Sequence, residues 1–178
     1  PGVRIVASRS STQPIWAGLV ETREGLTDRR VRQAINYAIN KQALVDRLLR
    51  GYGRVASQPC PYQRECWNPD VEAYPFDPDR ARALLAEAGV TDLSITLNFP
   101  TGVVPQGDLL AQAVAADLRR VGITAEIVQD EWSVFAGKLF DFANRQARLG
   151  DMFLMYYGAG STLERIIATV LVSDRNWN

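Results

Sequence analysis

The sequence contains no histidine, and this absence excludes several kinds of site at once. A Ser-His-Asp or Cys-His catalytic site cannot be built, and a zinc or iron centre with histidine ligands cannot be built either. Acid–base chemistry would fall to Asp, Glu, Lys, Tyr or Cys. We therefore expect a protein that is not an enzyme and that holds neither a metal ion nor a cofactor.

Cysteine is scarce, because Cys60 and Cys66 in the segment CPYQREC are the only two. Structural zinc requires four ligands, so two thiols without histidine make a poor metal site. One possibility is a disulfide that closes a small loop in an oxidising compartment. The other is two unpaired thiols, which the spacing alone does not exclude.

Neither sign of charge is in excess and long apolar runs are missing. Lys+Arg and Asp+Glu number 20 each among 178 residues, so no surplus of positive charge attracts a nucleic acid. The sequence contains no run of about 18 apolar residues, the length that crossing a membrane requires. No signal peptide is visible and the chain begins at Pro1, which indicates a processed product or a piece of a longer protein. What is present is a composition typical of one globular domain, with 47% apolar residues.

The segment LTDRRVRQAINYAINKQALVDRLLRGYG, residues 26–53, is rich in basic residues and could be a nucleic-acid-binding helix or an ordinary amphipathic one. Its apolar residues recur at helical spacing and form one stripe. Thr27 or Asp28 can cap its start and Gly51 can end it. Asp28 can also pair with Arg32, four residues on, so the charges are partly neutralised. We predict one core-packing helix and no nucleic-acid partner.

Strands and helices alternate along the rest of the chain. Asp77 and Pro78 open a helix that Gly89 ends. The residues between 52 and 76 are rich in Pro, Gly and aromatic residues and form an irregular excursion that carries both cysteines. We expect strands at 3–7, 15–20, 93–99, 123–129 and 151–157, and further helices at 106–121, at 131–142 and after the capping box that starts at Ser161. This alternation predicts an α/β fold with a mainly parallel sheet flanked by helices.

Ligands of open parallel sheets bind beyond the carboxyl ends of the strands, and two strand ends here are unusual. One is the turn NFPTGVVPQGD at residues 98–108, and the other is YYGAGSTLE at 156–164. The second loop lacks the third glycine of a dinucleotide fingerprint and the Gly-Lys of a P-loop. Its helix start still offers N–H groups to an anionic or carbonyl group. A nucleotide- or phosphate-binding enzyme domain that uses the loop Gly158–Ser161 is therefore the alternative interpretation.

The candidate ligand-binding residues gather at these strand ends. Trp132 begins a predicted helix, and two tyrosines end the last predicted strand. Alternation places one of the two tyrosines in the core and the other on the opposite face. The candidate set is Trp132, Tyr156, Tyr157, Gly158, Ala159, Gly160 and Ser161.

Three segments occur in an order that resembles the extracellular solute-binding proteins of family 5, the receptors for oligopeptide, dipeptide and nickel ABC importers. They are DRRVRQAINYAINKQALVDRLLRGYGRVASQP, YPFDPDRARALLAEAGV and QAVAADLRRVGITAEIV. The resemblance runs from about Leu26 to the C-terminus. It implies that residues 1–178 form a single lobe, most of the C-terminal lobe of a two-lobe protein, with hinge-proximal strands in 1–22. It also implies a periplasmic monomer that docks on membrane permease subunits, and this location favours the Cys60–Cys66 disulfide.

The resemblance carries over some binding residues but not all of them. Peptide-binding members have a Glu-Trp pair at a helix start, with the Trp lining the ligand pockets, and here that pair is Glu131–Trp132. Members also have a strand that ends in Gly-Trp, with an Asp three residues later that holds the peptide's ammonium group. Tyr157 stands at that Trp position and Gly160 at the Asp position. The resemblance therefore implies uptake of a peptide or a similar small polar solute without the usual amine anchor; a sensory domain that reuses the lobe is a further possibility.

Overall fold

The computed structural model describes residues 14–20, 23–58, 67–141 and 149–156. These residues build one four-stranded sheet in the order β1-β4-β2-β3. The strands are β1 (Ile15–Leu19), β2 (Leu93–Pro100), β3 (Ile123–Asp130) and β4 (Met152–Tyr156). β2 pairs in parallel with both β3 and β4, whereas β1 pairs antiparallel with β4. The predicted α/β fold with a mainly parallel sheet is confirmed, and β1 adds one antiparallel edge.

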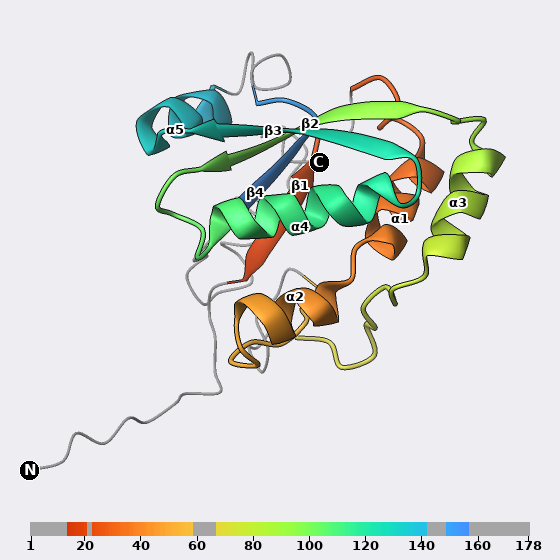
Figure 1. The fold of residues 1–178 in the computed structure, drawn as a ribbon, viewed down its shortest axis with the longest axis horizontal. Coiled ribbons are helices and arrows are strands. Elements are labelled where there is room, and N and C mark those ends of the chain that lie inside the picture. Colours follow the sequence, from red (N-terminus) through yellow and green to blue (C-terminus); the bar gives the residue numbers. More distant parts are fainter. Residues whose placement is uncertain (1–13, 21–22, 59–66, 142–148, 157–178) are drawn as a thin grey trace, which may run out of the picture.

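Five helices flank this sheet in the described part of the chain. Figure 1 shows α4 running along the sheet, with α1 and α3 toward one end of it and α5 at the other. The helices are α1 (Arg29–Ala38), α2 (Lys41–Leu48), α3 (Pro78–Glu87), α4 (Gly107–Arg119) and α5 (Trp132–Phe140). Of these helices, none has the length and apolar character that crossing a membrane requires.

The side chains of β4 point alternately to the two faces of the sheet, and their contacts show which helices cover each face. Met152 and Leu154 point into the larger apolar core, which contains the buried residues of α1, α3 and α4. Phe153 and Met155 belong to a smaller cluster with Phe135 and Leu139 of α5. Since successive side chains of a strand point to opposite faces, α5 covers the face opposite to α1, α3 and α4.

Local sequence signals fix several element ends as predicted. The Asp77 side chain accepts a hydrogen bond from the Arg80 N–H, and Pro78 is the first residue of α3. Gly89 follows the helix with a φ of 71°, in the left-handed region that glycine adopts without strain. The described residues between α2 and α3 contain neither helix nor strand, as expected for this Pro- and Gly-rich segment.

The prediction of a single helix over residues 28–50 is wrong, because α1 ends at Ala38 and α2 begins at Lys41. At the break, the Asn36 carbonyl accepts a hydrogen bond from Lys41 Nζ at 2.6 Å. In a continuous helix that carbonyl would accept from the Asn40 N–H. The Asn40 N–H instead donates to Asp117 Oδ2 on α4 at 3.0 Å. The apolar stripe continues across the break because residues of both helices pack on the same core.

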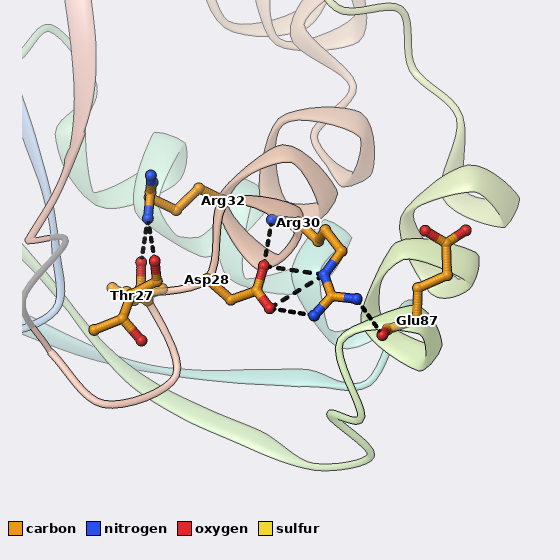
Figure 2. Close-up of polar contacts among 6 residues, drawn as sticks. Thr27, Asp28, Arg30, Arg32 and Glu87 are labelled. Carbon is orange, nitrogen blue, oxygen red and sulfur yellow. Dashed lines mark hydrogen bonds and ion pairs between the residues drawn. The ribbon is translucent and has the colours of Figure 1, made fainter.

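The start of α1 also differs from the sequence prediction in one ion pair (Figure 2). Asp28 caps the helix as expected, accepting from the Arg30 N–H at 2.8 Å. Its carboxylate pairs with the Arg30 side chain, with Nη2 and Oδ2 2.6 Å apart. Arg32, the predicted partner, instead donates to the carbonyls of Leu26 and Thr27. Arg30 also reaches the Glu87 carbonyl, and this contact joins α1 to the end of α3.

Candidate functional site

The carboxyl ends of β2, β3 and β4 lie at one edge of the sheet, which we call the ligand edge. The register pairs Pro100, the last residue of β2, with Asp130, the last residue of β3. The Thr101 N–H and hydroxyl both donate to the Asp130 carbonyl, at 2.8 and 3.1 Å. Tyr156 ends β4 and pairs with Ile15 at the start of β1. This edge is where an open parallel sheet presents its ligand site.

Trp132 stands at the ligand edge as the first residue of α5, with 41% of its surface exposed. The preceding Glu131 caps the helix, because its carboxylate accepts from the Ser133 N–H at 2.7 Å and from the Ser133 hydroxyl. These hydrogen bonds lower the pKa of Glu131, the side-chain bond having the larger effect. A fixed helix start therefore presents a large, partly exposed ring to solvent.

The Trp132 ring rests on a buried aromatic support. It stacks on Phe135 with ring centroids 6.2 Å apart and planes at 27°. Phe135 is fully buried and meets Phe153 of β4 edge-on, with centroids 6.4 Å apart. The three rings form a continuous column from the sheet to the ligand edge, so the inner face of Trp132 is packed while its outer part stays accessible.

A polar cluster lies beside this column and ties α5 to the sheet. Lys138 Nζ is 2.9 Å from Asp130 Oδ1 and 2.7 Å from Oδ2. Asn98 Nδ2 of β2 donates to Asp130 Oδ2 at 3.1 Å. The Asp130 side chain is only 12% exposed and the Asn98 residue 3%. We call Asn98, Asp130 and Lys138 the anchor cluster.

The turn after β2, which the sequence marked as unusual, is held to α2. Gln106 Nε2 donates to the Leu48 carbonyl at 2.6 Å. Gln106 has a φ of 51°, a left-handed conformation that costs a non-glycine residue energy. Gly107 follows with Phe99 3.0 Å from where a Cβ would stand, so α4 begins in close contact with β2.

The predicted ligand-binding residues are only partly within the described part of the chain. Trp132 and Tyr156 lie at the ligand edge, from α5 and β4. Tyr157, Gly158, Ala159, Gly160 and Ser161 lie outside the described residues, and so do Cys60 and Cys66. The loop Gly158–Ser161 and the disulfide therefore stay predictions.

The anchor cluster was missed by sequence reasoning. Asp130 and Lys138 are eight residues apart, a spacing that no pairing rule within a helix covers. A signal existed in β2, where Ser94, Thr96 and Asn98 alternate with apolar residues and mark a partly polar face. Asn98 is one of two buried polar residues among those described. A buried asparagine in a strand requires hydrogen-bond partners, and this requirement could have directed attention to Asp130.

In the described ranges, no group of three or more Cys, Asp and Glu side chains is arranged to hold a metal ion. Two acids at the ligand edge have internal partners: Asp130 contacts Lys138 and Asn98, and Glu131 accepts from Ser133. In the described part of the chain, this edge offers a ligand the exposed part of an aromatic residue and the backbone groups of the strand ends.

Comparison with known families decides where this arrangement belongs. The model of the bacterial extracellular solute-binding proteins, family 5 Middle, matches residues 3–177. The chain belongs to this family of extracellular solute-binding proteins. The family is one of transport components rather than of enzymes, and it was the family that the sequence resembled.

Individual family members show the same relation. The dipeptide-binding protein of Escherichia coli K12 is 34% identical over 131 residues, covering 70% of this chain and 24% of its own length. The nickel-binding periplasmic protein of the same organism is 31% identical over 147 residues, covering 72% and 26%. A dipeptide binding protein from Pseudoalteromonas sp. SM9913, solved in complex with Met-Leu, shares the fold with a TM-score of 0.80 at 22% identity, covering 89% of this chain and 31% of that one. The chain thus spans about a quarter of the length of these two curated relatives.

Proposed function

We propose that this chain is part of the solute receptor of an ABC importer, in which it forms one lobe of a two-lobe protein outside the cytoplasm. The ligand, a peptide or a similar small polar solute, lies between the lobes. It favours the closed state, and the closed receptor docks on the permease. Family membership and the names of the peptide- and nickel-binding relatives support this function.

The observation that carries the proposal is the placement of Trp132. A tryptophan that is 41% exposed stands at the carboxyl edge of the sheet, on a capped helix start and a buried aromatic column. Ligand sites combine such rigid apolar walls with a few polar groups. We infer that Trp132 lines the ligand, together with Tyr156, Tyr157 and the loop Gly158–Ser161.

The test is titration calorimetry with a panel of di- and tripeptides, and it uses the complete two-lobe receptor of which this chain is a part. Binding should be measurable, and Trp132→Ala should weaken it at least about tenfold, a loss of about 1.4 kcal/mol. Phe140→Ala is the matched control, because Phe140, which is 50% exposed, is an aromatic residue at the other end of α5. Absence of binding to any peptide would contradict peptide uptake. Equal effects of the two substitutions would contradict the assignment of Trp132.

We further infer that no carboxylate holds a ligand's ammonium group at the anchor position, where the sequence has Gly160 in place of the Asp of peptide-binding members. Asp130 and Glu131, two acids at the described ligand edge, have internal partners. An unpaired buried charge costs several kcal/mol, so a bound ammonium would need a carboxylate from elsewhere. One peptide should therefore bind the receptor with similar affinity whether its N-terminus is free or acetylated. A loss of about 3 kcal/mol or more on acetylation would show that a carboxylate holds the amine.

A further inference from the structure

We propose that the anchor cluster of Asn98, Asp130 and Lys138 is a positioning device that sets where Trp132 stands at the ligand edge. The proposal deepens the function proposed above and rests on it, since it assigns Trp132 to the ligand site. The three residues do not touch the ligand in this account; they act through α5.

The geometry of the cluster is that of a specific tie. Lys138 Nζ contacts both oxygens of Asp130, and Asn98 donates to one of the same oxygens. The side chains of Lys138 and Asp130 are 25% and 12% exposed, so water screens this pair less than an exposed one. Gly150, with a φ of 85°, crosses beside Asn98 so closely that a Cβ would lie 2.7 Å from Asn98 Oδ1. Asn98 is therefore held in place between Gly150, which precedes β4, and Asp130.

The cluster joins three elements on the face of the sheet that α5 covers. Asn98 comes from β2, Asp130 ends β3, and Lys138 lies in the last turn of α5. Phe135, one turn before Lys138, packs against the sheet, and Trp132 lies one turn before Phe135. The helix is thus held by apolar packing near its middle and by an ionic tie near its end.

The two kinds of contact do different things. Apolar burial is non-directional, so Phe135 and Leu139 bring α5 to the sheet but only loosely fix its rotation about its own axis and its position along the sheet. Charged hydrogen bonds have short, well-defined distances, and they therefore fix the rotation and the position of the helix. A shift of the last turn of a nine-residue helix moves its first residue as well, and that residue is Trp132. The cluster accordingly determines the angle at which the ring meets a ligand.

The experiment uses ¹⁹F NMR of the full chain labelled with 5-fluorotryptophan, without any ligand. The sequence has four tryptophans, and the Trp132 line is assigned by its loss in Trp132→Phe. Lys138→Met removes the charge and keeps most of the side-chain length. We expect the Trp132 line to move by more than its width in this variant while the Trp16 line, from β1, stays in place. Lys138→Arg, which retains the tie, should return the Trp132 line toward its original position.

Arg23→Met is the matched control. Arg23 and Asp151 form a similarly enclosed pair, 2.6 Å apart with side chains 37% and 15% exposed, that contacts β2 through Thr96 rather than α5. This control should leave the Trp132 line unchanged. If Lys138→Met collapses the Trp16 line as well, Asp130→Asn is measured in its place. This substitution removes the negative charge of the cluster but keeps a hydrogen-bond acceptor for Lys138 and Asn98. The Trp132 line should again move while the Trp16 line stays in place.

The outcomes separate cleanly. A Trp132 line that stays in place in a folded Lys138→Met variant overturns the proposal. A Trp132 line that moves equally in Arg23→Met overturns it as well, and so does the collapse of all lines in both Lys138→Met and Asp130→Asn, because the cluster would then hold the fold in general. None of these results depends on a bound solute, so failure of peptide binding in calorimetry contradicts the proposed function without affecting this readout.

Discussion

Replacing Phe135 by alanine should destabilise the protein strongly, because this side chain is fully buried at the centre of the smaller core. It packs with Leu139, Leu149 and Met155, and its ring also contacts Trp132 and Phe153. Truncating a buried phenylalanine costs about 3–5 kcal/mol, since both transfer free energy and packing are lost. Domains have total stabilities of about 5–15 kcal/mol, so the change removes a large share of the free energy of unfolding.

Urea unfolding followed by circular dichroism measures this loss. With a slope of about 2 kcal/mol per molar urea, a loss of about 4 kcal/mol lowers the midpoint by about 2 M. Phe135→Leu, which retains most of the volume, should cost less than about 1.5 kcal/mol. Phe140→Ala makes the same substitution in the same helix at a residue that is 50% exposed, and it should cost less than about 1 kcal/mol.

The comparison of these variants can refute the assignment of the second core. If Phe135→Ala costs less than about 1 kcal/mol, α5 is not held on the sheet by this ring. If Phe140→Ala costs as much as Phe135→Ala, the face of α5 that carries Phe140 is buried as well. The first result would also remove the support on which Trp132 is placed at the ligand edge.

Two further predictions concern the larger core and the acid side of the pH range. Asp117→Ala should cost about 2 kcal/mol in urea unfolding, because it removes the charged acceptor of the Asn40 N–H at the break between α1 and α2. The control is Asp79→Ala, which removes a side chain that is 95% exposed and should cost less than about 1 kcal/mol. Equal costs of the two substitutions would contradict the role of Asp117 at the break. Partial burial raises the pKa of Asp151, but hydrogen bonds from Arg23 and Thr96 outweigh it, and the net pKa lies below the usual 3.8. A lowered pKa contributes stability that is present above pH 3.8 and is lost as the pH falls through the lower folded-state value. The urea midpoint of Asp151→Asn should therefore fall less between pH 5 and pH 3 than that of the unchanged protein, and parallel profiles would contradict the assignment.

Much of the fold was readable from the sequence because its causes are local. The Asp77 cap and the left-handed Gly89 act within a few residues of the helix that they delimit. The alternation of strands and helices then leaves few topologies, and this is why a mainly parallel sheet could be predicted. The antiparallel partner of β4 could not be read in this way, because strand order depends on contacts between distant segments.

The candidate site divides in the same manner. Trp132 could be identified from its position after a predicted strand and at a capped helix start, both of which are local. Its support could not, because Phe135 meets Phe153 and Asp130 meets Asn98 only when β2, β4 and α5 are assembled.

What the sequence by itself determined is the class of the fold, the family and the position of Trp132 at a strand end. These follow from periodicity, caps and an ordered set of motifs. Only the tertiary structure decided that the helical segment after Asp28 breaks at Asn40. There the Asn40 N–H donates to Asp117, 77 residues away, instead of to a carbonyl of its own helix. It also decided how α5 is fixed, through an aspartate and a lysine whose spacing matches no local rule. Both decisions depend on buried polar groups that must find partners, and those partners come from wherever the fold brings a matching group within reach.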